Sequence, residues 1–302
     1  MVGVTDSGRG IRVPATWWPA MLATAYAVAF VLVYVVSVRT EQGRLVSDAA
    51  LRGAIASGSP IRDTVDSVLD VVSVGSLLGA VAVVAVIALL RLDRIRGLAA
   101  IGLLVVANVV SRVLKSYVLE RPDLGLDEIG PATLNSLPSG HATAAFSAVT
   151  ALLIVLPPAW HAATALAGGG FATVIALATM FAGWHRTADA MASFLVVGVC
   201  TMVALSVVAA YAEPRPHASA PVGLRWWLVV SGASLAIGAA LGGGLSTLAP
   251  VRDSLAGGLL AFLSAGLLII GTVLAVLAGI LWVLGVNEAE GGRPDDRVRL
   301  SG

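Results

Sequence analysis

The stretch "LAAIGLLVVANVVSRVLKSYVLERP", residues 98–122, decides the class of fold. Its apolar part is about twenty residues long, enough for a helix to cross the hydrocarbon core of a bilayer. Asn108, Ser111, Arg112 and Lys115 interrupt it at spacings that place all four on one helical face. A cation in hydrocarbon is costly unless it meets a polar partner or cavity, so this face is expected to point into the protein. For Lys115, snorkelling to the membrane interface is the alternative.

Similar apolar runs recur along the whole chain, in which 58% of residues are hydrophobic and 12% are charged. Soluble domains have about 25% charged residues, so this composition indicates a membrane protein. The runs are continuous rather than alternating, which indicates helices and not a barrel. We predict an all-α polytopic protein with eight spans, at about 16–38, 67–90, 98–118, 141–158, 162–184, 190–211, 226–248 and 256–286. The first is expected to be a retained helix, since its apolar run is longer than that of a signal peptide.

Basic residues near the ends of the spans predict the orientation. The loop "RLDRIRG", residues 91–97, carries three arginines and resists translocation, so we expect it on the cytoplasmic side with the N-terminus. The loops after the third and fifth spans then lie together on the outer face. Ten arginines fall in cytoplasmic segments against seven outside, which are Arg39, Arg44, Arg52, Arg62, Arg121, Arg186 and Arg252.

Charge and cysteine usage exclude several other classes of function. The net charge is +1 and no basic patch is interleaved with aromatic residues, so no nucleic-acid partner is expected. Cys200 is the single cysteine and lies inside an apolar run, which excludes an intramolecular disulfide and a cysteine metal cage. The sequence has no other metal-ligand cluster, and neither a metal nor a cofactor is expected.

The stretch "NSLPSGHATAAF", residues 135–146, places a polar turn directly before the fourth span. Ser139 and Gly140 stand where the helix should begin, and the first free N–H groups of a helix form an anion site. His141 follows beside that site. Taken alone, the Pro-Ser-Gly-His tetrad is also compatible with a helix cap and an interfacial histidine.

The stretch "FAGWHRTADAMASF", residues 181–194, lies in the next outward loop. His185 and Asp189 are four residues apart, which lets a carboxylate approach an imidazole across one helical turn. Asp189 would keep one ring nitrogen protonated and leave the other free as a nucleophile or base. A capping aspartate beside an interfacial histidine is the alternative. All three polar stretches fall on one face of the membrane in the predicted topology, which favours a functional site.

These stretches together resemble the type-2 phosphatidic acid phosphatases, also called lipid phosphate phosphatases. The pattern of that family is K-x6-R-P, then P-S-G-H, then S-R-x5-H-x3-D. Residues 138–141 match the second motif completely, and His185 with Asp189 match the end of the third. The resemblance covers about residues 65–212, together with the first span, and implies a six-helix core with its site at one membrane surface.

The resemblance also implies a role for each matching residue. His185 would be the nucleophile and form a phosphohistidine, with Asp189 orienting it. His141 would protonate the departing lipid oxygen and later activate water. The phosphoryl oxygens would be bound, without a metal, by Lys115, Arg121, Ser139 and the N–H of Gly140.

Two departures from the family pattern affect phosphate binding. Lys115 and Arg121 have five residues between them rather than six, and Ala178 and Thr179 occupy the Ser-Arg positions of the third motif. Two arginines are candidates to replace the missing cation. We favour Arg186, because it follows the expected nucleophile where the phosphate must enter, over Arg112, which would approach from one turn below Lys115.

The expected organisation follows from the spans and the resemblance. It comprises a cytoplasmic N-terminal segment (1–15), a six-span phosphatase core (16–212), a cytoplasmic linker (213–225), two additional helices (226–286) and a disordered cytoplasmic tail (287–302). The additional helices contain "GAALGGGLS", residues 238–246, whose small residues let helices approach closely. We expect these helices to serve packing or to form a homodimer.

The function expected from the sequence is hydrolysis of a lipid phosphate or diphosphate at the outer face of a bacterial cytoplasmic membrane. A polyprenyl carrier is the favoured substrate, because an outward site meets the spent carriers of envelope assembly. Alternatives are a glycerophospholipid phosphatase and a phosphatase of a prenyl-linked sugar phosphate. A non-hydrolytic lipid-phosphate binder or transporter is the alternative from another class.

Overall fold

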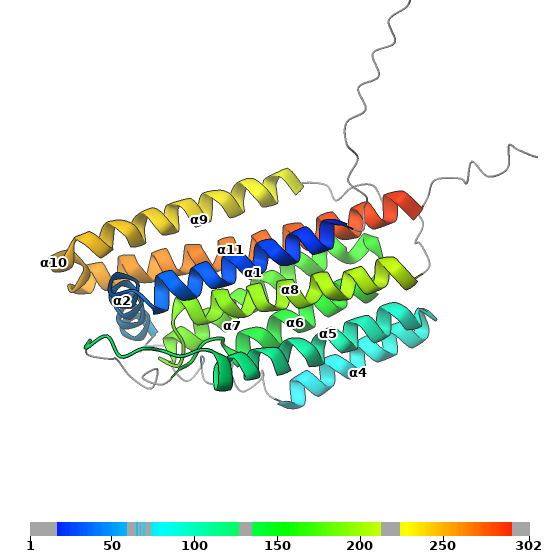
Figure 1. The fold of residues 1–302 in the computed structure, drawn as a ribbon, viewed down its shortest axis with the longest axis horizontal. Coiled ribbons are helices and arrows are strands. Elements are labelled where there is room, and N and C mark those ends of the chain that lie inside the picture. Colours follow the sequence, from blue (N-terminus) through cyan, green and yellow to red (C-terminus); the bar gives the residue numbers. More distant parts are fainter. Residues whose placement is uncertain are drawn as a thin grey trace, which may run out of the picture.

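The structure is a computed structural model that describes residues 17–58, 65, 67, 69, 74–126, 135–212 and 224–291. Within these ranges the regular structure is helical throughout, which confirms the predicted all-α class (Figure 1). The helices are α1 (Trp17–Val38), α2 (Glu41–Gly58), α4 (Val74–Leu90), α5 (Arg94–Val113), α6 (Gly140–Val155), α7 (His161–Phe181), α8 (Thr187–Tyr211), α9 (Leu224–Thr247), α10 (Ala249–Arg252) and α11 (Leu255–Gly291). A π-helix, Leu114–Val118, continues α5, and a 3₁₀-helix, Pro158–Trp160, precedes α7.

The predicted spans correspond to the apolar helices. Six helical segments of the described residues are long and apolar enough to cross a membrane: Trp17–Val38, Arg94–Val118, Pro158–Phe181, Thr187–Tyr211, Leu224–Thr247 and Leu255–Gly285. The other two predicted spans correspond to the shorter apolar helices α4 and α6. The chain is therefore a multi-pass membrane protein.

Several predicted segments lie wholly or partly outside the described residues. These are the N-terminal segment, most of the predicted linker 213–225, and the part of the tail from residue 292 onward. The tail was expected to begin at residue 287, but α11 continues to Gly291.

α8 lies at the centre of the bundle. In its most apolar 18-residue stretch, 67% of the residues are buried, a larger share than in the other helices long enough to span a membrane. The corresponding share in α9, at the outside of the bundle, is 22%. Phe194 of α8 packs edge-on against Phe146 of α6, with ring centroids 4.9 Å apart. The extra helices pack on each other within the chain, since Ser264 of α11 donates a hydrogen bond to the carbonyl of Gly238 in α9. Gly238 of α9 thus serves intramolecular packing, whereas Gly243 and Gly244 are exposed.

The helix α2 was not predicted, because the segment after the first span was expected to be an outer loop. In Figure 1 it is seen almost end-on, crossing the direction of the long helices at one end of the bundle. It buries Arg44, Ser47 and Asp48 while Glu41 and Gln42 are exposed. Gly53 seats it on α11, because a Cβ there would collide with the carbonyl oxygen of Gly258. A search for continuous apolar runs misses such a helix, since only one of its faces is buried.

The same end of the bundle holds the loops that the sequence analysis placed together. The π-helix, the start of α6, the end of α7 and the start of α8 meet there, beside α2 (Figure 1). Direct contacts join these segments: Asn135 donates to the carbonyl of Lys115, and the N–H of Ser139 donates to the carbonyl of Asp189. The loops after the third and fifth predicted spans therefore lie at one end, as expected.

Candidate active site

His185 is placed by the turn that ends α7. Gly183 has a φ of 77°, a left-handed conformation that glycine adopts without strain. The N–H of Gly183 bonds the carbonyl of Met180, and the N–H of Trp184 bonds the carbonyl of Thr179. These two bonds form the Schellman motif that closes many helices. The chain is thereby reversed within a few residues, and His185 is fixed between the end of α7 and the start of α8.

Asp189 organises the centre of the site. It is fully buried, and its Oδ2 lies 3.2 Å from Nδ1 of His185. The same oxygen accepts hydrogen bonds from Oγ of Ser136 at 2.5 Å and from the N–H of Arg186 at 2.9 Å. The bond from Arg186 satisfies a free donor at the start of α8, as in one half of a capping box. These contacts hold the carboxylate against the imidazole, so that a proton on Nδ1 leaves Nε2 as the reactive nitrogen.

The Pro-Ser-Gly-His tetrad forms the start of α6, as predicted. Ser139 is the N-cap, has extended backbone, and accepts a hydrogen bond from the N–H of Ala142. Ser193 donates to the carbonyls of both Ser139 and Asp189 at 2.8 Å. The second and third motifs are therefore tied together through backbone. Gly140 is exposed at the end of the helix, where free N–H groups favour an anion.

His141 stands in the first turn of α6 and packs against Trp184, the residue before His185. It is half-buried, and its ring lies 5.6 Å from the ring of Trp184, centroid to centroid. His141 also interacts electrostatically with His185 and Lys115. The structure thus brings the two histidines and the single lysine into one cluster.

Two cations from the first motif reach this cluster. Lys115 lies in the π-helix and is half-buried, and Asn135 donates to the carbonyls of Lys115 and Leu119 at 2.9 and 2.6 Å. The side chain of Arg121 is 4% exposed, with its guanidinium 4.0 Å from Oδ1 of Asp189. Lys115 and Arg121 are separated by one residue fewer than in the family pattern. The segment between them contains most of the π-helical turn, in which the helical register changes.

Arg112 does not share the inward face that its spacing predicted. Asn108 bonds Ser147 of α6, and Ser111 is buried against Thr143, but the side chain of Arg112 is exposed. At about 100° per residue, a step of four positions turns Arg112 about 40° from Asn108, toward the exposed Val105. The expectation of a four-residue inward stripe was wrong for Arg112.

Arg186 follows His185 directly but does not lie at the surface. Its side chain is 1% exposed, and its Nε donates to Oδ1 of Asp48 in α2 at 2.7 Å. At the position where the family pattern has arginine, Thr179 is fully buried and donates to the carbonyl of Ala176. The expected surface position of Arg186 was therefore wrong, because a carboxylate from an unpredicted helix draws the guanidinium inward.

Comparison with known proteins assigns this part of the chain. The model of the PAP2 superfamily matches residues 96–213. Over these residues the chain is similar to that superfamily. No curated protein and no solved structure matches the chain. The PAP2 match and the apolar helices together support a membrane phosphatase in general terms.

The PAP2 region, residues 96–213, contains every site residue predicted from the sequence, but not every residue that holds the site. Sequence reasoning missed Ser136, which lies three residues before Ser139 and binds Asp189. It also missed Arg44 and Asp48, which come from outside the PAP2 region. The sequence signal for these two was a pair of opposite charges four residues apart in a segment read as a loop.

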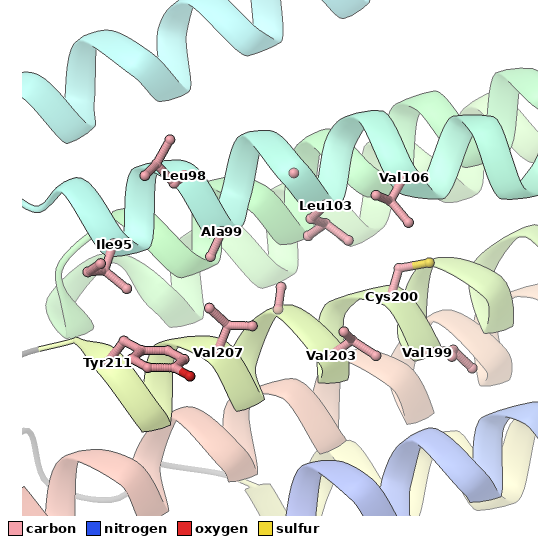
Figure 2. A pocket seen from close by; sticks show the side chains of 12 residues that line it. Ile95, Leu98, Ala99, Leu103, Val106, Val199, Cys200, Val203, Val207 and Tyr211 are labelled. Carbon is pink, nitrogen blue, oxygen red and sulfur yellow. The ribbon is translucent and has the colours of Figure 1, made fainter.

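The described residues contain no group of three or more His, Cys, Asp or Glu side chains that could hold a metal ion. An apolar groove of about 420 Å³ lies between α5 and α8, at the end of the bundle away from the site (Figure 2). Figure 2 shows Leu103 and Val106 of α5 facing Cys200 and Val203 of α8. Apart from Tyr211 and Cys200 the residues that line the groove are apolar, and none of them carries a charge that could bind phosphate.

Proposed function

We propose that the protein is an integral-membrane lipid phosphatase that works through a phosphohistidine. The observation that carries the proposal is the pairing of His185 with Asp189, whose carboxylate also binds Ser136. His141, at the start of α6, packs against the neighbouring Trp184. The similarity of residues 96–213 to the PAP2 superfamily supports the reaction class.

In the proposed reaction, Nε2 of His185 attacks phosphorus while Nδ1–H stays hydrogen-bonded to Asp189. The phosphorus–oxygen bond to the lipid breaks, and His141 gives a proton to the leaving oxygen. Water then attacks the phosphohistidine, His141 takes the proton of that water, and the phosphorus–nitrogen bond breaks to release phosphate. With a diphosphate, the leaving group is the lipid monophosphate. Asp189 stabilises the charge that forms on the imidazole.

Phosphate binding is assigned to groups that surround His185 and His141. Lys115 and Arg121 supply positive charge, and Ser139 with the Gly140 N–H supplies donors at the start of α6. Phosphoryl transfer depends on such preorganised positive charge and N–H donors around the reacting group. These groups neutralise the phosphoryl charge in this proposal, so activity should persist in excess EDTA. A loss of activity in EDTA that Mg²⁺ restores would contradict this part.

A polyprenyl phosphate or diphosphate is the proposed substrate, hydrolysed at the outer face of a bacterial cytoplasmic membrane. The orientation rests on the arginines of residues 91–97, at the end of the bundle opposite the site. Phosphatidate, phosphatidylglycerol phosphate and prenyl-linked sugar phosphates are the alternative substrates. Phosphate release from a panel of these lipids by the purified protein in detergent tests the proposal, and release from none of them would contradict it.

The proposed orientation has its own test. In a Cys200→Ala background, single cysteines replace the exposed residues Gln42 and Asp123 near the site and Leu92 at the opposite end. An impermeant thiol reagent added to spheroplasts should label the first two and spare the third. The reverse pattern would place the site on the cytoplasmic face.

A non-hydrolytic lipid-phosphate binder is the second candidate. The observation that favours it is Thr179, a buried hydroxyl where the family pattern has an arginine. Such a protein would bind the lipids of the panel without releasing phosphate. Binding that is stable for hours with no phosphate release would favour this candidate over the phosphatase.

A further inference from the structure

The helix α2 buries two opposite charges at the site end of the bundle. Arg44 is 1% exposed and Asp48 is 3% exposed, and their spacing of four residues places them on one helical face. Buried charges are retained only where they are paired or hydrogen-bonded. Each of these two residues contacts a chain segment that carries part of the site, although α2 lies outside the PAP2 region.

Asp48 holds the segment that carries the expected nucleophile. Its Oδ1 accepts a hydrogen bond from Nε of Arg186 at 2.7 Å, and both side chains are at most 4% exposed. Arg186 is the N-cap of α8, follows His185 directly, and donates its N–H to Asp189. Removing one partner of a buried ion pair leaves the other charge uncompensated. The ion pair therefore fixes the backbone between His185 and the carboxylate that orients it.

Arg44 holds the segment that carries the second cation. It donates from Nη1 to the carbonyl of Pro122 at 3.1 Å, next to Arg121. On the other side of Arg121, Tyr34 of α1 donates to the carbonyl of Glu120 at 2.7 Å. The two carbonyls that flank Arg121 are thus held by helices from the N-terminal part of the chain.

We propose that α2 is a positioning clamp that sets the distance between His185 and Arg121. Asp48 acts on His185 through Arg186, and Arg44 acts on Arg121 through Pro122; neither Asp48 nor Arg44 touches the phosphoryl group. Arg186 is then a positioning residue, in place of the phosphate-binding role expected from the sequence. The proposal rests on the proposed function, because it assigns positions to groups of the phosphatase reaction.

A double-mutant cycle on the full chain tests the clamp. Asp48→Asn and Arg186→Gln should each lower kcat by about 10- to 100-fold, since a small displacement of a reacting group has effects of this size. KM should stay within about threefold of the wild-type value. Because the two side chains act as one pair, the double variant should be no worse than the worse single variant. Direct phosphate binding by Arg186 predicts instead a raised KM for Arg186→Gln with Asp48→Asn near wild type, and that result would overturn the clamp.

A matched control lies on the same helix. Arg52 is on the exposed side of α2 and approaches Asp253 at 3.5 Å, with the two side chains 43% and 55% exposed. Arg52→Gln removes an ion pair of α2 without touching the site, and its activity should stay within about twofold of wild type, as an exposed pair contributes little. A loss in Arg52→Gln equal to that in Asp48→Asn would show a general effect of α2 and would contradict the clamp.

Further measurements distinguish a loss of folding from a change in the position of His185. Thermal unfolding and size exclusion in detergent show which variants fold; if Asp48→Asn does not, Asp48→Glu and Arg186→Lys keep the charges and shift the contact. Both should lower kcat, and values within about twofold of wild type in both would overturn the clamp.

A second experiment does not depend on turnover: the rate at which diethyl pyrocarbonate modifies His185 is measured by mass spectrometry. It should be severalfold faster in the Asp48 variant than in wild type, even if the wild type releases phosphate from no lipid. An unchanged rate would refute the clamp without bearing on the phosphatase.

Discussion

The two ends of the bundle differ in what they bury. At the site end, charged and polar side chains are buried in contact with one another, among them Asp48, Arg186 and Asp189. At the opposite end, the groove between α5 and α8 is lined by apolar side chains such as Leu103 and Val203 (Figure 2). Burying polar groups is costly unless each finds a partner. The comparison indicates that the site holds charges in fixed positions, whereas the groove packs apolar side chains.

The largest effect expected at the site end is that of His185→Ala. Removing the nucleophile eliminates the covalent route, so kcat should fall by about 10⁴-fold or more, as when nucleophiles are removed from other covalent enzymes. Phosphate release from the best lipid substrate measures it. Thermal unfolding of the variant in detergent is the control. A folded variant with a tenth of wild-type activity would remove His185 from the central role.

Asp189→Asn is expected to have the next largest effect. Asparagine has nearly the same shape, but its amide favours the wrong imidazole tautomer, so kcat should fall by about 10³- to 10⁴-fold with KM little changed. Steady-state kinetics on the folded variant provide the measurement. Ser136→Ala removes another contact of the same carboxylate and should cost less, because His185 keeps its charged partner. Equal losses in the two variants would contradict the orienting role.

A smaller effect is expected for Lys115, and it should distinguish Lys115 from Arg112 in the same helical segment. Lys115→Met should lower kcat/KM by about 100-fold, equivalent to ~2.7 kcal/mol, because it removes an electrostatic partner of the phosphoryl group. Arg112 is exposed three residues earlier, and Arg112→Met should stay within about threefold of wild type. The pair is compared on the same substrate. Equal losses would show that Arg112 reaches the phosphate, which was the less favoured of the two alternatives from the sequence.

The smallest effect is expected in the apolar groove. Ala99→Leu places a larger side chain in the groove of Figure 2, away from the site. Activity should stay within about twofold of wild type, since no proposed catalytic group lies there. Turnover and KM are measured in detergent and in liposomes. A severalfold rise in KM would show that the groove binds the substrate chain, and the two ends would no longer be functionally separate.

The site end was only partly predictable from sequence. His141, His185 and Asp189 could be found because they lie in short polar motifs at the ends of apolar runs, and such motifs are visible in the local sequence. Asp48 could not, because its partner Arg186 lies 138 residues away, and its helix is too polar for a search based on apolar runs. Ser136 was hidden for the same reason, since 53 residues separate it from Asp189. Local patterns revealed the groups with distinctive chemistry, while the contacts that hold them depend on how distant segments pack.

The apolar helices were easier to predict than their faces. Continuous runs fix the number and approximate bounds of the spans, since a bilayer demands about 20 apolar residues in each. The face of a single residue is less certain, because one position of helical rotation moves a side chain by about 100°. Arg112 lies close enough to the inward stripe to be assigned to it, yet its side chain is exposed.

Trapping the covalent intermediate tests the central claim most directly. Rapid quenching of the purified protein with labelled lipid phosphate should leave phosphate on the chain that is labile to acid and stable to base. Mass spectrometry should place it on His185, and His185→Ala should abolish it. Labelling that survives in His185→Ala, or a wild-type enzyme that turns over with no labelled intermediate, would contradict the account.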